Sequence, residues 1–124
     1  MVAIDFTASN LDANIPSSLH YIDPSGANLN QYATAITSVG SVLEFYDHDK
    51  QFPLYGFGGK VRPHEPADHC FPLNGNEGNP EVTGVHGVLM SYYESLKRVA
   101  LSGPTLFGQI IQQASAIAAS TPFT

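Results

Sequence analysis

Basic residues and cysteines are scarce in this sequence, and both absences exclude classes of function. Lysine and arginine account for only 5 of the 124 residues, against 11 aspartates and glutamates, which gives a formal net charge of −6. Apart from the pair Lys97-Arg98 there is no basic cluster, so the charge argues against binding nucleic acid or an anionic membrane surface. An acidic chain is better suited to binding cations.

The lone cysteine, Cys70, excludes an internal disulfide and a cysteine-rich zinc module, and it is compatible with a reducing compartment. The sequence does not open on a basic segment followed by an apolar core, so no signal peptide is expected. No apolar run approaches the roughly 20 residues of a membrane-spanning helix. These absences predict a soluble, intracellular domain.

The spacing of apolar residues predicts an α/β chain with the element order β-α-β-β-α-α. Three short apolar runs indicate strands at residues 2–6, 52–57 and 69–73. Pro72 in the third run favours an edge position, because proline cannot donate to a β-ladder. Helical periodicity predicts a helix that ends near residue 46. The apolar face of this helix comprises Leu29, Tyr32, Ala33, Ile36, Val39, Gly40, Leu43 and Tyr46.

Start signals predict two further helices. Asn79 can cap the second helix, Pro80 suits its first position, and Glu81 favours the positive end of the helix. The third helix is expected to open at Gly103-Pro104-Thr105 and to continue to about residue 118.

This order begins like a doubly wound, Rossmann-like sheet with flanking helices, but it lacks the later strands. The first strand is central in such a sheet, and here its second edge has no partner in the sequence. We therefore expect residues 1–124 to be the N-terminal portion of a larger domain. The first strand should lie at an exposed edge, where a strand from a second copy could pair with it.

The segment Asp5-Phe6-Thr7-Ala8-Ser9 places one carboxylate and two hydroxyls directly after the first strand. These oxygens are the hard ligands that Mg²⁺, Mn²⁺ and Ca²⁺ prefer. Taken alone, a D-x-T-x-S string is a common one, and its side chains more often cap turns by bonding to nearby backbone groups.

Other chemistries have weaker support in the sequence. Asp47-His48-Asp49 lacks the remaining positions of an EF-hand, and Gly56–Lys60 lacks the spacing of a phosphate loop. Zinc would require the irregularly spaced group His64, Asp68, His69 and Cys70. A hydrolase that uses Asp5 and a histidine is a separate hypothesis, although the sequence has no G-x-S-x-G turn.

Several segments, taken together, resemble the von Willebrand factor A-type domain of copines. The matching segments are residues 2–10, 18–22, 46–53, 55–58, 69–74, 84–89 and 103–105. Plant RING-type ubiquitin ligases carry a similar domain. The strings Leu19-His20-Tyr21-Ile22-Asp23 and Asp47-His48-Asp49-Lys50 are closer to copines.

The resemblance implies a metal-ion-dependent adhesion site for Mg²⁺ or Mn²⁺, with Ca²⁺ as an alternative. Its ligands would be Asp5, Thr7 and Ser9 from a first loop and Thr105 from a second. A third loop of the fold supplies an aspartate after a later strand, and no such segment is present in this sequence. We therefore expect the cation to bind weakly, or not at all, to these 124 residues.

The resemblance also implies a binding function without catalysis. Intracellular partner proteins would dock through an acidic side chain at the metal site. The parent protein would bind phospholipid in a calcium-dependent manner, and its C2 domains would recruit it from the cytoplasm to the plasma membrane during calcium signalling. In the alternative of a RING-type ubiquitin ligase, the domain would bind substrates instead.

Overall fold

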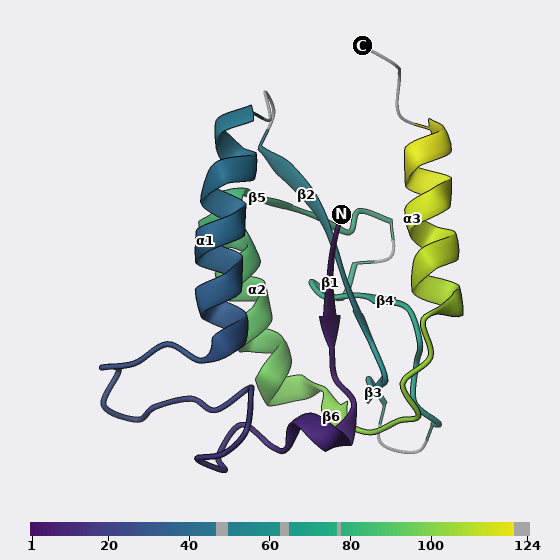
Figure 1. The fold of residues 1–124 in the computed structure, drawn as a ribbon. Coiled ribbons are helices and arrows are strands. Elements are labelled where there is room, and N and C mark those ends of the chain that lie inside the picture. Colours follow the sequence, from purple (N-terminus) through teal and green to yellow (C-terminus); the bar gives the residue numbers. More distant parts are fainter. Residues whose placement is uncertain (47–49, 63–64, 77, 121–124) are drawn as a thin grey trace.

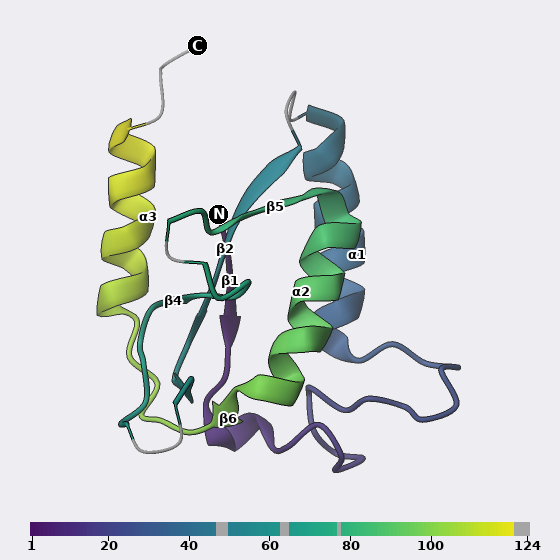
Figure 2. The same ribbon diagram turned by 180° about the vertical axis from the view of Figure 1, so that it is seen from behind.

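The computed structural model describes residues 1–46, 50–62, 65–76 and 78–120, which form an α/β fold in layers. Helices α1 (Gln31–Tyr46) and α2 (Gly84–Arg98) lie side by side against one face of a sheet (Figure 1). Helix α3 (Gly108–Ser120) lies on the opposite side, as the reverse view in Figure 2 also shows. No helix in these ranges has both the length and the apolar character needed to cross a membrane.

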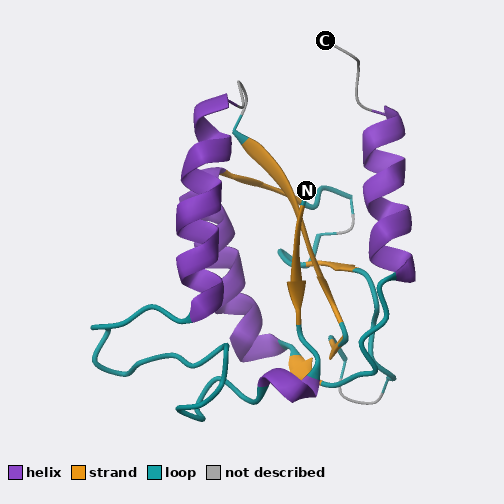
Figure 3. Ribbon diagram, in the orientation of Figure 1, coloured by secondary structure: helices purple, strands orange, loops and turns teal. Residues whose placement is uncertain are grey.

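The strands form a mixed main sheet and a small second sheet (Figure 3). The main sheet contains β1 (Val2–Asp5), β2 (Gln51–Phe57), β4 (Phe71–Pro72) and β5 (Glu81–Thr83). Strand β2 pairs in parallel with β1 and antiparallel with both β4 and β5. The second sheet pairs β3 (Gly59–Lys60) with β6 (Ala100–Leu101), and a 3₁₀ helix, η1 (Ala8–Asn10), follows β1.

The predicted α/β class and the order of the larger elements are confirmed. Strand β1 lies at an edge of the main sheet, since β2 is its ladder partner among the described residues, and β4 with Pro72 lies at the other end of that path. Both edge positions agree with the predictions. The short strands β3, β5 and β6 and the helix η1 were not predicted, because two or three residues carry no measurable periodicity.

The predicted start of the second helix is wrong. Residues 81–83 form strand β5, and α2 begins at Gly84. Gly84 has a φ of +67°, a left-handed conformation that favours glycine and turns the chain from strand into helix. The carboxylate of Glu44 on α1 then accepts a hydrogen bond from the Val85 N–H at 3.1 Å. Pairing with β2 and this contact with α1 therefore outweigh the local start signal at Asn79.

The third helix also begins later than predicted. Residues 103–107 form a loop, and α3 starts at Gly108. The chain just before this loop is held elsewhere, since the Ser102 N–H donates to the Phe6 carbonyl at 3.1 Å.

The core divides between the two faces of the sheet. Ile4, Phe52 and Leu54 pack with Val88 and Tyr92 of α2, between the sheet and the α1/α2 layer. On the other face, a smaller cluster joins side chains of β2 to α3 and contains Tyr55, Phe57 and Ile110. The alternation along β2 therefore supplies both cores.

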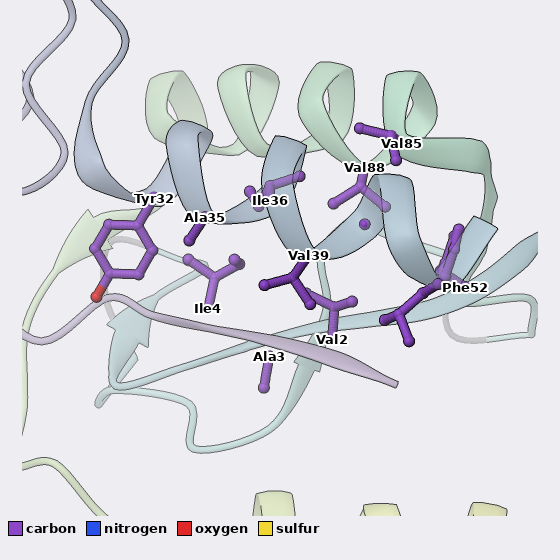
Figure 4. Close-up of a pocket in the computed structure, with 12 residues that line it drawn as sticks. Val2, Ala3, Ile4, Tyr32, Ala35, Ile36, Val39, Phe52, Val85 and Val88 are labelled. Carbon is purple, nitrogen blue, oxygen red and sulfur yellow. The ribbon is translucent and has the colours of Figure 1, made fainter. Parts of the chain in front are cut away.

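An apolar groove with a volume of about 300 Å³ runs between α1 and the open edge of β1. Figure 4 shows Val2 and Ile4 of β1 pointing toward Ala35, Ile36 and Val39 of α1. The described residues that line the groove include no charged side chain.

Two positions on the predicted apolar face of α1 are exposed at this groove. Val39 is 59% exposed and Leu43 is 46% exposed, whereas Ala33 on the same helix is fully buried. The periodicity located the face correctly, but among the described residues no strand beyond β1 covers the C-terminal part of this helix face.

Candidate functional site

The predicted oxygen ligands of the first loop lie together at the carboxyl end of β1. The Thr7 hydroxyl donates to Asp5 Oδ1 at 2.6 Å, and the Thr7 N–H donates to the same oxygen at 2.8 Å. The Ser9 hydroxyl oxygen lies 3.5 Å from the Thr7 hydroxyl oxygen. Thr7 is buried and Ser9 is exposed, so this row of oxygens reaches the surface at Ser9.

Turn capping explains the side-chain contacts of Asp5 in this loop but not those of Thr7. Asp5 does cap a turn, because its carboxylate accepts the N–H of Thr7 two residues later. Thr7 occupies the N-cap position of η1, yet its side chain makes no capping hydrogen bond there. The Thr7 hydroxyl instead donates its hydrogen to Asp5, which leaves the oxygen lone pairs for another partner.

The fourth predicted ligand, Thr105, is only partly brought to the site. Ser102 forms a parallel bridge with Thr7, and its carbonyl accepts the Ala8 N–H. This pairing places the turn Gly103-Pro104-Thr105 beside the first loop. Thr105 itself is exposed, and within the described ranges its side chain makes no hydrogen bond to Asp5, Thr7 or Ser9.

A buried histidine supports the first loop from behind, and no local pattern in the sequence predicts its burial. His20 is fully buried, and its Nε2 lies 2.8 Å from the Asp5 carbonyl oxygen. Its Nδ1 lies 2.7 Å from the hydroxyl of Tyr92 on α2. The ring stacks between Tyr32 at 4.2 Å and Phe6 at 5.6 Å, measured between ring centroids. His20 lies within the turn-rich segment 9–28, where burial is not expected, and Tyr92 was predicted only as a member of the apolar face of a helix.

Burial governs the electrostatics of this histidine and its neighbours. Desolvation lowers the pKa of His20, and the hydrogen bond and charge of Asp5 oppose that effect. Desolvation likewise raises the pKa of Tyr32, helped by the negative charge of Asp5, and it raises the pKa of Tyr92 well above its usual value. All three rings are therefore neutral near pH 7.

The hydrogen-bond pattern also bears on the hydrolase hypothesis. His20 contacts the backbone carbonyl of Asp5 and not its carboxylate. Both ring nitrogens of His20 are already within hydrogen-bond distance of a partner. This is not the imidazole–carboxylate pair that a hydrolase with Asp5 would use.

The oxygen atoms of the loop fit one part of a hard-cation site. Asp5 supplies a carboxylate, and Thr7 and Ser9 supply neutral oxygens, which is a donor set suited to Mg²⁺ or Mn²⁺. Across the residues that the structure describes, no three histidine, cysteine, aspartate or glutamate side chains come together as a metal-binding group. The loop itself supplies three oxygen-bearing side chains, and waters or further ligands would complete the coordination of such a cation.

The structure also shows what residues of the other candidate sites do, namely those of the phosphate loop and the zinc group. The Gly58 N–H, within the glycine-rich run, donates to the Asp68 carbonyl at 2.9 Å and so is not free to hold a phosphate. Asp68 itself accepts the Cys70 N–H at 3.0 Å, as a turn cap does. Residues 47–49 of the EF-hand-like string and His64 of the zinc group lie outside the described residues.

Comparison with known proteins gives a consistent result. A family model described as Copine matches residues 18–123. Protein BONZAI 1 of Arabidopsis thaliana is 55% identical over 122 residues, which cover 98% of this chain and 21% of that protein. Protein BONZAI 2 of the same plant is 52% identical over 122 residues, which cover 98% of this chain and 20% of that protein. The chain spans about a fifth of the length of the curated relatives it matches. On the family match and these identities, the chain belongs to the copine family.

Proposed function

We propose that this chain forms part of a von Willebrand factor A-type domain that binds partner proteins through a divalent cation. The observation that carries the proposal is the row of oxygens from Asp5, Thr7 and Ser9 at the end of β1. Ligands of open α/β sheets bind outside the carboxyl ends of the strands, which is where this row lies. The parallel pairing of β1 with β2 and the helices on both faces support the assignment of the fold.

In this proposal each predicted ligand has a distinct role. The hydroxyls of Thr7 and Ser9 bind the cation directly, and the carboxylate of Asp5 either binds it or holds one of its waters. Thr105 joins from the neighbouring turn. A bound Mg²⁺ or Mn²⁺ keeps an open position that an acidic side chain of a partner protein can fill.

The activity of the whole protein is likewise a proposal. We propose a parent that binds phospholipid in response to calcium and moves from the cytoplasm to the plasma membrane through C2 domains. Membership of the copine family supports this parent over a RING-type ubiquitin ligase. The domain itself would bind proteins and carry out no catalysis.

The metal site predicts a gain in thermal stability with Mg²⁺ or Mn²⁺. The gain should appear in a chain extended by the later strand and aspartate of the domain, since the extension adds the missing carboxylate. Ligand at about 100 times its Kd contributes about 2.7 kcal/mol, which corresponds to a rise of several degrees in Tm. Asp5→Asn should abolish the shift, and differential scanning calorimetry measures it.

Asp23→Asn is a matched control for this experiment. Asp23 Oδ1 accepts the N–H and the hydroxyl of Ser25 at 2.9 and 2.7 Å, which reproduces the local geometry of Asp5 and Thr7 on an exposed loop. This variant should keep the metal-dependent shift. Absence of any shift in the extended chain, or its survival in Asp5→Asn, would contradict the proposed site.

The open edge of β1 supports a second, separate proposal, that the 124-residue chain associates with itself. Among the described residues, the main sheet has no strand beyond this edge of β1, which lies next to an apolar groove, and such edges attract another strand. A second copy can add its own β1 and cover the exposed side chain of Val39.

Self-association predicts a mass that rises with concentration. In light scattering, the average mass of the chain should rise from 13.3 kDa toward twice that value. Val39→Lys should hold it at the monomer value, because pairing would bury the new charge. Met90→Lys, on the 49% exposed Met90 of α2 outside the groove, should associate as the unmodified chain does. A monomer at every concentration, or equal effects of both lysines, would refute this interface.

A further inference from the structure

We infer that His20 is a positioning residue of the proposed metal site, acting on it through the backbone of Asp5. The inference rests on the proposed function, because it assigns a role toward the same row of oxygens. His20 touches none of the predicted ligand oxygens itself. Its Nε2 lies 2.8 Å from the Asp5 carbonyl oxygen, on the peptide unit that joins Asp5 to Phe6.

The hydrogen-bond chain determines which nitrogen of His20 carries the proton. The carbonyl oxygen of Asp5 can only accept, so Nε2 must be the donor in this contact. Nδ1 is then the acceptor of the neutral ring, and the Tyr92 hydroxyl donates to it at 2.7 Å. Asn30 Nδ2 in turn donates to the Tyr92 oxygen at 3.0 Å. In the series of hydrogen bonds that runs from Asn30 through Tyr92 and His20 to Asp5, each donor and each acceptor is therefore defined.

The same residues tie the loop to both helices. Asn30 also caps α1, since its Oδ1 accepts the Ala33 N–H at 2.7 Å. Tyr92 belongs to α2 and is fully buried. Stacking on Tyr32 and Phe6 holds the plane of the imidazole, so the direction of its Nε2–H is set by the core of the molecule.

A second donor restrains the same carbonyl. Asn10 Nδ2 lies 3.1 Å from the Asp5 oxygen and 3.2 Å from the Tyr32 hydroxyl. Two donors on one carbonyl restrict rotation of the peptide that follows Asp5. That rotation would separate the Asp5 carboxylate from the Thr7 N–H and hydroxyl, which both donate to it. Outer contacts of this kind orient ligands in other metal sites.

Two substitutions of His20 separate this role from a merely structural one. In His20→Gln, the side-chain amide reaches the place of Nε2 and can still donate to the Asp5 carbonyl. In His20→Asn, the shorter amide reaches only the place of Nδ1 and keeps the contact with Tyr92. Both variants lose the stacked ring and one hydrogen bond, so we expect their Tm values to fall by similar amounts.

The first measurement needs no metal. Amide hydrogen exchange of Thr7 in the 124-residue chain reports on its bond to the Asp5 carboxylate. The exchange should be up to about tenfold faster in His20→Asn and close to the unmodified rate in His20→Gln, because a hydrogen bond worth about 1.4 kcal/mol changes an opening equilibrium about tenfold. The second measurement is Mn²⁺ affinity in the extended chain, which should fall by about 10–100-fold in His20→Asn and by much less in His20→Gln.

Equal exchange rates and equal Mn²⁺ affinities in the two variants would overturn the positioning role. Faster Thr7 exchange in His20→Asn alone, with no Mn²⁺ binding by the unmodified extended chain, would support the positioning of the loop and refute the proposed function. Should either His20 variant fail to fold, Tyr92→Phe removes only the hydroxyl that donates to Nδ1. It should raise Thr7 exchange and lower Mn²⁺ affinity, and no change in either would overturn the inference.

Discussion

Replacing Gly56 by valine should lower the free energy of unfolding by about 3 kcal/mol or more, the upper range of the cost of overpacking. Gly56 lies in β2 between Ile4 of β1 and Phe71 of β4. A Cβ at this position would lie 2.7 Å from Phe71 Cζ and 2.8 Å from Phe6 Cε2. Both rings are buried, and neighbouring strands flank Gly56, so neither the rings nor β2 can move aside cheaply. Urea unfolding followed by circular dichroism measures the loss.

A smaller substitution and a paired one test the cause. Gly56→Ala should cost about 1–3 kcal/mol, and combining it with Phe71→Leu should cost less than the sum of the two, because leucine lacks the ring atoms nearest the new methyl group. Gly108→Ala is the control, since a Cβ there meets no atom within 4 Å. A Gly56→Val chain as stable as the unmodified one would show that this part of the core is loosely packed.

Phe6→Ala should destabilise the chain by about 3–5 kcal/mol, the usual cost of removing a buried phenyl ring. Phe6 is fully buried and lies between the two predicted ligands Asp5 and Thr7. Its ring packs against Phe71 at a centroid distance of 5.7 Å and stacks on His20 at 5.6 Å. The loss is a large part of the roughly 5–15 kcal/mol that holds a domain folded.

Phe107→Ala is the matched control for this substitution. Phe107 also pairs with another ring, Phe57, at 5.5 Å, but it is 53% exposed. Its removal should cost less than about 1.5 kcal/mol, the range of the aromatic pair itself. Urea unfolding of both variants gives the comparison. Equal losses in the two would mean that burial of Phe6 contributes little beyond the ring contact.

The sequence predicted those helices and strands that short stretches of neighbouring residues specify. Strands β1 and β2 were found as short apolar runs, and helix α1 was found because its apolar residues repeat with the helical period. The start of α2 was wrong because residues 81–83 gain more from pairing with β2 than from the capping signal at Asn79. That pairing joins residues some 30 positions apart, and no local pattern records it.

The candidate site likewise has one part that local sequence predicted and another part that it did not. Asp5, Thr7 and Ser9 are neighbours in sequence, and their mutual contacts follow from one turn after a strand. Thr105 required the family resemblance, and the structure brings its turn near the loop through Ser102. His20 and Tyr92 are separated by 72 positions, and their contact could not be predicted from either segment.

The amino-acid sequence alone establishes the α/β class, the oxygen-rich loop after the first strand and the resemblance to copines, because each is carried by short segments that can be recognised one at a time. Only the folded structure reveals where α2 begins and how His20 and Tyr92 hold the loop from behind. These depend on backbone pairing and on the burial of polar rings, and both are properties of segments that meet only when the chain folds. The fully buried His20 is the clearest case, since a turn-rich segment gives no local reason for a polar side chain to be enclosed.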